Sequence, residues 1–474
     1  MEKAKTNKKA RTKKKKPSPR HHSLAETIAE EPAIILEKTI DESKKIASLF
    51  ANQKTVKKAA EYWHLLGPGL TTGAADDDPS GVATYSQAGA RYGFQWLWLA
   101  TFTFPLMAVA QEMCARIGLV TGRGLASNIK KFLPPWVLYT ATILLFAANT
   151  FNIGADLGAM AKATQLLFPD LDFGLLVFAF AGLTLGLQIF TTYQKYARYL
   201  KWLALILLSY VFTAMLVDID WAAVLKSTFV PTFSWDKESI ILITGVLGTT
   251  ISPYLFFWQT SQEVEEEILK GKTRIKDRVG ATDQEVREMR LDVWSGMLLS
   301  NLVMFFIIAT CSATLFASGI TNINTAADAA AALKPLAGEN AYLLFTLGII
   351  GTGLLAIPVL AGSVAYALSE SFRWREGLYN KLDRAQAFYG VIIISVFVGL
   401  ALNFINLDPI KALIYSAVAN GLVAPMVLIP IVVISSNKKI MGKHANGILN
   451  KIFGWAVVAL MVFAGIATIY SLFI

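Results

Sequence analysis

Cysteine and charge are scarce in this sequence. Only 2 of the 474 residues are cysteines, Cys114 and Cys311, and each lies within an apolar stretch. Two isolated thiols exclude a disulfide framework and a thiolate metal site. Charged residues make up 16% of the chain, whereas a soluble domain carries about a quarter. With 54% hydrophobic residues, the composition excludes an ordinary soluble enzyme and predicts an all-α integral membrane protein.

Positive charge is concentrated at the N-terminus. The first 20 residues hold ten Lys or Arg against one acid, and they lack the apolar core of a secretory signal. Runs of like charge are usually disordered, so we predict that residues 1–60 form a basic, largely disordered cytoplasmic extension. Its expected partners are anionic lipid head groups, and no nucleic-acid partner is expected. Residues 61–474 form the predicted transmembrane domain.

Apolar stretches long enough to cross a bilayer, roughly 20 residues each, recur through this second domain. We predict eleven spans, at residues 62–91, 93–117, 134–168, 173–193, 196–217, 239–260, 292–317, 340–372, 385–405, 409–435 and 452–473. The even-numbered loops carry most of the Lys and Arg, which places them and the N-terminus in the cytoplasm. The C-terminus is then outside, and we assign the protein to the plasma (inner) membrane.

Two spans carry helix-breaking residues near their middle. The first contains PGLTTGAADDDPSG and the sixth contains GVLGTTISPY. Because proline removes a backbone donor and clashes with the preceding turn, we expect both helices to be unwound at the membrane midplane. Breaks in corresponding positions of two groups of five spans are typical of secondary transporters. We therefore predict two inverted five-helix repeats followed by an eleventh helix.

Carboxylates accompany the first break and the third span. Asp76, Asp77 and Asp78 directly precede Pro79, and Asp156 lies near the middle of the third span. Charge inside a membrane is costly and by default functional. We expect Asp78 to face a cavity at mid-depth as a cation ligand. Asp156, Asp76 and Asp77 are candidates for proton transfer or gating, although Asp156 is equally well explained as a structural partner.

A second acidic run, Glu263 to Glu267, follows the sixth span. Such a run is usually a solvated helix end, which is the reading we prefer. An ion-attracting vestibule is the alternative.

Residues 67–94, GPGLTTGAADDDPSGVATYSQAGARYGF, resemble the first helix of the NRAMP family of divalent metal transporters. Asp78 and Pro79 match the start of its Asp-Pro-Gly-Asn motif, and residues 87–90 match its Gln-Ala-Gly-Ala. Stretches in the second, third and eighth spans are also similar, so the resemblance covers about residues 62–442. It implies the LeuT-like fold of two inverted repeats, in agreement with the pattern of broken spans.

Several departures from the family motifs concern the metal site. The family's Met-Pro-His of the sixth helix is Ser252-Pro253-Tyr254 here, a later histidine is Gln259, and the asparagine ligand of the first helix is Gly81. Replacing sulfur by a hydroxyl favours hard cations over soft ones. Magnesium uses one or two carboxylates and keeps several waters. The sequence therefore looks closer to the NRAMP-related magnesium transporters.

The resemblance implies a set of site residues. Asp78 and Ser252 are the expected metal ligands, and the wider predicted binding set is Asp78, Ala75, Gly81, Thr249, Thr250, Ser252, Tyr254 and Gln259. The resemblance and its departures imply that the transported substrate is a divalent cation of the magnesium or manganese class. No cofactor and no enzymatic activity are expected.

Three alternatives stay open at this point. One is a transporter of a small organic cation or amino acid on the same scaffold, because Tyr254 and the aromatic residues that follow it offer faces for a cation. Another is an intramembrane aspartyl protease built from Asp78 and Asp156. The last is a receptor or scaffold that transports nothing.

Overall fold

The computed structural model describes residues 67–191, 208–405 and 407–473, and every regular element within these ranges is a helix. Eight helical segments of the described residues are long and apolar enough to cross a membrane. The helices of the second to fourth and seventh to eleventh spans are α5 (Leu97–Thr121), α7 (Pro135–Leu167), α8 (Phe173–Phe190), α15 (Asp283–Cys311), α18 (Ala341–Phe372), α19 (Gln386–Leu402), α20 (Pro409–Ser436) and α22 (Ile448–Ser471). These bounds lie within a few residues of the predicted spans, except that α15 begins at Asp283 and not at 292. α19, with 17 residues, is a shorter apolar helix and is not among the eight membrane-length segments.

Two predicted segments are described only in part or not at all. Of the predicted fifth span, the structure describes α10 (Leu208–Leu216). The predicted basic extension at residues 1–60 lies outside the described residues.

The first and sixth spans are interrupted, as predicted. The first consists of α3 (Pro68–Asp76) and α4 (Pro79–Tyr92), and the sixth of α12 (Lys237–Thr250) and α13 (Pro253–Leu269). In each span a proline occupies the first position of the second half-helix. Proline is tolerated there because the amide it lacks would have had no partner within the helix. The break therefore has a local cause in the sequence.

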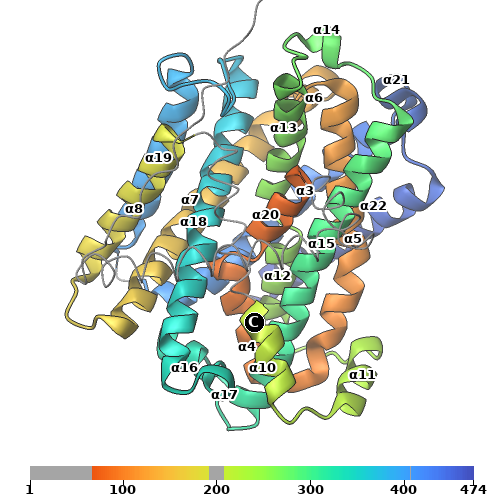
Figure 1. Ribbon diagram of the computed structural model, residues 1–474. Helices are drawn as coiled ribbons and strands as arrows, with labels where there is room; N and C mark the ends of the chain where they lie inside the picture. Colours follow the sequence, from red (N-terminus) through yellow and green to blue (C-terminus); the bar gives the residue numbers. More distant parts are fainter. Residues whose placement is uncertain (1–66, 192–207, 406, 474) are drawn as a thin grey trace, which may run out of the picture. The chain divides into compact units, whose positions relative to one another are not determined.

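The half-helices pack among the long helices through close backbone contacts (Figure 1). α15 runs along α3, α4 and α5, whereas α7 contacts α18, α19 and α20. α12 lies against α20, where Gly248 and Gly421 let the two backbones meet. Small residues permit this approach between membrane helices. α15 thus contacts both half-helices of the first span, and α7 contacts α4.

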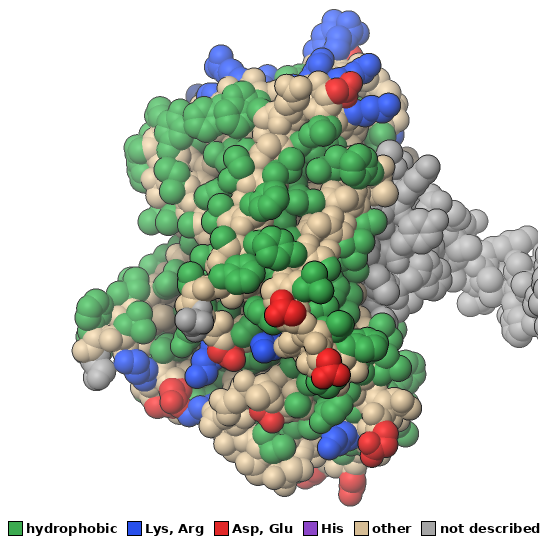
Figure 2. All heavy atoms as spheres, turned by 90° about the vertical axis from the view of Figure 1, so that its left-hand side faces the viewer, with side chains coloured by type: hydrophobic (Ala, Val, Ile, Leu, Met, Phe, Trp, Pro, Cys, Tyr) green, Lys and Arg blue, Asp and Glu red, His purple; other side chains and the backbone are tan. Residues whose placement is uncertain are grey.

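Short helices and loops gather at the two ends of the bundle. α6 (Leu125–Phe132), α14 (Ile275–Arg278) and α21 (Lys438–Met441) lie at one end, whereas α11 (Trp221–Phe229), α16 (Ala326–Ala331) and α17 (Lys334–Ala337) lie at the other (Figure 1). Figure 2 shows hydrophobic side chains over the middle of one face and charged ones toward its ends. The even-numbered loops that are described therefore share one end, as the alternating topology requires. Which end faces the cytoplasm stays a prediction.

The acidic run after the sixth break differs from the prediction. Glu263, Glu265 and Glu267 are 6%, 7% and 1% exposed, so they are not a solvated helix end. The Glu265 carboxylate accepts hydrogen bonds from the Tyr366 hydroxyl and from the backbone of the loop after α18. α18 and the loop that follows it cover Glu265, whereas Glu263 bonds to Gln259 and Glu267 pairs with Lys272.

Candidate functional site

Asp78 stands at the break in the first span and is 1% exposed. It is the N-cap of α4, with extended backbone, and its Oδ1 accepts the Gly81 amide at 2.7 Å and the Ser80 hydroxyl at 2.6 Å. Its Oδ2 accepts the Asn152 side-chain amide of α7 at 2.7 Å. Aspartate is among the best N-caps because its oxygen satisfies a free amide of the first turn. The capping geometry therefore fixes this buried carboxylate between α4 and α7.

Asp76 and Asp77 bond to the opposite side of the break. The Ser300 hydroxyl of α15 lies 2.6 Å from Oδ2 of Asp76 and 3.4 Å from Oδ1 of Asp77. The unwound segment thus divides its three aspartates between two neighbours, with Asp78 bonded to α7 and the other two to α15. Within the described residues, no group of three or more His, Cys, Asp or Glu could hold a metal together. The three carboxylates therefore do not form one site.

The break in the sixth span contributes hydroxyl and carbonyl oxygens. The Ser252 hydroxyl donates to the backbone oxygens of Gly248 at 2.9 Å and Thr249 at 2.7 Å. A hydroxyl has two acceptor lone pairs besides its proton, so Ser252 retains lone pairs for a cation. The Thr249 side chain lies against Gly81, since a Cβ added at Gly81 would be 3.1 Å from Thr249 Oγ1. These contacts bring the two breaks together.

Two tyrosines join the first and sixth spans. The Tyr254 hydroxyl donates to the Ala75 carbonyl at 2.9 Å, and the Tyr85 hydroxyl lies 3.3 Å from Thr250 Oγ1. Each carbonyl oxygen has two lone pairs. Ala75 and Thr249 belong to the predicted binding set. The carbonyl oxygen of each already accepts one hydrogen bond from a side-chain hydroxyl and keeps one lone pair free.

Gln259 is bonded away from the break. Its Oε1 accepts the Thr72 hydroxyl of α3, and its Nε2 donates to Glu263 at 2.9 Å. This places Gln259 in a polar chain that runs from Thr72 of α3 to Glu263 of α13. The predicted role of Gln259 in the pocket lining stays a prediction.

Asp156 is fully buried on α7, and both of its carboxyl oxygens are buried without a hydrogen-bond partner among the described residues. Asn152 lies one helical turn earlier, on the same face. Its Oδ1 is likewise buried without a partner. α7 thus offers an unsatisfied carboxyl group and an unsatisfied amide oxygen next to Asp78.

Three residues near the breaks were not among the predicted site residues. Asn152 supplies an amide beside Asp78, although the family's amide ligand corresponds to Gly81 in this chain. The sequence feature that could have indicated Asn152 is its four-residue spacing from Asp156, which places both residues on one helix face. Ser300 and Met304 come from α15, and the Met304 sulfur lies 3.8 Å from Thr250 Oγ1. No sequence motif marks either position. Asn152 and Met304 thus bring an amide and a thioether close to the breaks from other helices. The predicted losses concern the motif positions Gly81 and Ser252, and their effect on the site stays a prediction.

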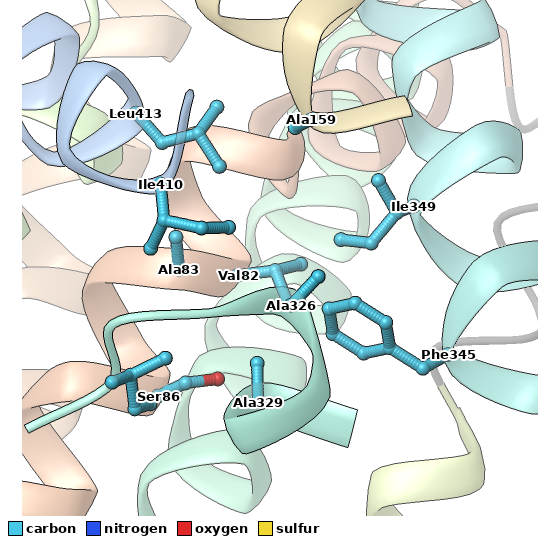
Figure 3. A pocket seen from close by; sticks show the side chains of 11 residues that line it. Val82, Ala83, Ser86, Ala159, Ala326, Ala329, Phe345, Ile349, Ile410 and Leu413 are labelled. Carbon is cyan, nitrogen blue, oxygen red and sulfur yellow. The ribbon is translucent and has the colours of Figure 1, made fainter. Parts of the chain in front are cut away.

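A cavity lies beside α4, one to two turns beyond Asp78 (Figure 3). Helices α4, α7, α16, α18 and α20 line this cavity. Ser86 is a polar side chain in the lining, and most of the other side chains are apolar, among them Val82, Ala159, Phe345, Ile349 and Ile410. Asp78 is not among the residues that line this cavity, so the cavity is separate from the two breaks.

These observations define a class of protein. Two interrupted helices in corresponding places, with a buried carboxylate at one break, belong to an all-helical, multi-pass membrane protein of the LeuT-like fold. The solved structure of a manganese transporter from Eremococcus coleocola, in complex with an aromatic bis-isothiourea compound, has the same fold. Its TM-score is 0.66 at 19% sequence identity, over 85% of this chain and 86% of that one.

The chain itself belongs to the natural resistance-associated macrophage protein-like family, whose model matches residues 69–471. It is 29% identical over 411 residues to the divalent metal cation transporter MntH of Klebsiella pneumoniae, covering 84% of this chain and 92% of that protein. It is 24% identical over 412 residues to MntH of Aeromonas hydrophila, and this match covers 84% of this chain and 93% of that protein. The family is one of transporters, so the protease alternative is wrong and the prediction of a non-enzyme is confirmed.

Proposed function

We propose that this protein carries a divalent metal cation across the membrane and that its binding site prefers hard cations of the magnesium and manganese class. The observation that carries the proposal is the buried carboxylate of Asp78, held at the break of the first span beside the break of the sixth. The relatives from Klebsiella and Aeromonas bear the name of divalent metal cation transporters. Family membership and site therefore favour the same substrate class.

The donor set around Asp78 supports the hard-cation preference. Oxygen atoms are available from the carboxylate, from the Ser252 hydroxyl and from the unpartnered amide oxygen of Asn152. Backbone carbonyls at the two breaks add neutral oxygens. One carboxylate with neutral oxygens and retained waters suits magnesium, which dehydrates reluctantly. Manganese accepts the same donors.

Sulfur near the site limits the strength of this preference. Met304 contacts Thr250 from α15, so a thioether stands behind the sixth-span break even though Ser252 replaces the family methionine. Its sulfur accepts the Thr250 hydroxyl. A first-row transition metal that recruited Met304 would have to break this contact, which is a reason to expect manganese to be carried alongside magnesium and not in preference to it.

An organic cation or amino acid is the competing substrate. That alternative relies on aromatic faces near the sixth break. Trp258, however, packs against α18, where a Cβ on Gly362 would lie 2.7 Å from its ring. Its ring is also edge-on to Tyr366. These contacts occupy the largest of the aromatic side chains that the alternative requires.

The test uses the full-length protein in liposomes that contain an ion indicator and a pH-sensitive dye. We expect uptake of magnesium and manganese that is saturable and unaffected by a panel of amines and amino acids. Competition by an amine, with flux of the amine itself, would replace the metal by the organic substrate. Absence of any flux in liposomes, despite binding, would favour a receptor. The internal dye reports whether protons accompany the ion.

A further inference from the structure

One face of α15 follows the half-helix α3 along its whole length. Asp292, Gly296 and Ser300 are spaced by four residues, so they lie on one side of α15. All three are buried or contact α3 directly. Asp292, Gly296 and Ser300 meet the beginning, the middle and the end of α3, respectively.

Asp292 binds the beginning of α3. Its carboxylate accepts the backbone amides of Gly67 at 2.8 Å, Gly69 at 2.6 Å and Leu70 at 3.1 Å. The first amides of a helix have no partner within it, and the N-terminus carries partial positive charge. α3 has no side-chain cap of its own. A carboxylate more than 220 residues away in sequence therefore performs the capping.

Gly296 lets the two backbones touch in the middle of α3. A Cβ built on Gly296 would lie 2.2 Å from the Gly69 carbonyl oxygen, and one on Gly73 would lie 2.2 Å from the Gly296 carbonyl oxygen. Real Cβ atoms do not approach backbone atoms this closely. Any side chain at Gly296 must therefore push α3 away from α15.

Ser300 binds the end of α3. Its hydroxyl contacts the carboxylates of Asp76, the last residue of α3, and Asp77. Asp78 follows immediately. The position of the Asp78 carboxylate thus depends on where Ser300 holds the two residues before it.

We propose that Asp292 and Ser300 are positioning residues that fix α3 on α15 at both ends and so set the position of Asp78 in the cation site. Asp76 and Asp77 are then the anchor of the unwound segment on α15, which gives these two acids a role distinct from that of Asp78. The consequence for ion binding rests on the proposed function, whereas the docking of α3 on α15 does not depend on any substrate.

The test measures the docking of α3 directly. In the full-length protein with Cys114→Ala and Cys311→Ala, which removes the two buried native thiols, Thr72→Cys is the reporter. Thr72 is fully buried between α3 and α13, where its hydroxyl meets Gln259. A water-soluble maleimide then labels position 72 only when α3 separates from its neighbours.

We expect Asp292→Asn to raise the labelling rate about tenfold or more, because the loss of one hydrogen bond to a charged group already changes an equilibrium by this order. Gly296→Val should raise it at least as much. Ser300→Ala should raise it less, and should weaken the affinity for magnesium. Glu288→Gln is the matched control, one turn earlier on α15, where the side chain bonds to Gln284 at the surface.

Several outcomes separate this proposal from the proposed function. Unchanged labelling in both Asp292→Asn and Gly296→Val, with monodisperse protein, would overturn the docking role. Equal labelling in Glu288→Gln would also overturn it. A labelling increase without any divalent uptake by the native protein would uphold the docking role and remove the proposed substrate. If Gly296→Val fails to fold, Asp292→Asn alone tests the docking of α3, because asparagine keeps one acceptor oxygen. Unchanged labelling in Asp292→Asn would then overturn the docking role.

Discussion

Replacing Asp78 with asparagine separates its structural role from its charge. Asparagine caps a helix about as well as aspartate, so its Oδ1 can still accept the Gly81 amide. Its new NH2 group would face the NH2 group of Asn152. Asn152 can rotate its amide and present the Oδ1 that is at present unpartnered. Asp78→Asn should therefore preserve the hydrogen bonds while removing the negative charge.

The expected loss of cation affinity follows from Coulomb's law. Two unit charges about 4 Å apart interact by about 4 kcal/mol at an effective dielectric constant of about 20, and a divalent ion doubles this. If the cost of desolvating the ion cancels about two thirds of that sum, the remainder still weakens binding about 100-fold. The free energy of unfolding should change by less than about 1 kcal/mol, since the cap is retained.

Isothermal titration with magnesium and manganese measures the affinity, and thermal melting of the purified protein measures the stability. Asp172→Asn is the matched control, because Asp172 is also an N-cap, on α8, and is exposed. It should leave the metal affinity unchanged. Asp78→Ala should lose the affinity and, in addition, about 1 kcal/mol of stability with the lost cap.

Metal affinity within threefold of the native value in well-folded Asp78→Asn protein would refute the assignment of Asp78 as the charged ligand. If Asp78→Asn loses much stability, and its metal affinity falls no more than the fraction of folded protein does, the carboxylate is structural. The melting temperatures distinguish the two outcomes. If the charge matters only for ion binding, Asp78→Asn melts at a higher temperature than Asp78→Ala; if the carboxylate is structural, both variants melt at a similarly low temperature.

Two further changes test the donor set and the loop after α18. Ser252→Met should shift the ratio of manganese or cadmium to magnesium uptake by about tenfold toward the softer ions, and an unchanged selectivity series would contradict the hard-donor account. Burial, aided by the nearby carboxylates of Glu370 and Glu265, raises the pKa of Glu376 to about 9. The folded protein then holds a proton that the unfolded chain releases above about pH 4.3, so the stability contributed by this group is lost as the pH rises toward 9. Glu376→Gln should melt at a higher temperature than the native protein at pH 8 and show a flatter pH dependence; a pH profile identical to that of the native protein would contradict the shifted pKa.

The spans and the two breaks could be predicted from sequence because their causes are local. The predicted span 340–372 became α18 (Ala341–Phe372), and 409–435 became α20 (Pro409–Ser436), since apolar length and flanking proline and glycine determine where a membrane helix begins and ends. The break at Asp78 was equally local. Acid, proline and glycine at fixed offsets specify an N-cap and a first helical turn.

The surroundings of the breaks could not be predicted in the same way. The acids of α13 were expected to meet water, but packing against α18 and the loop after it decides the environment of Glu265. Which face of α15 meets α3 depends on the glycines that allow the two backbones to touch.

The sequence by itself thus indicated where the described spans lie, the positions of the breaks and the placement of a carboxylate at one of them, because each depends on neighbouring residues alone. Only the tertiary structure decided that Asp78 bonds to Asn152 while Asp76 and Asp77 bond to Ser300, and that Asp292 caps α3. Those contacts join residues 74 to 225 positions apart. They are set by how whole helices pack, which no short stretch of sequence specifies.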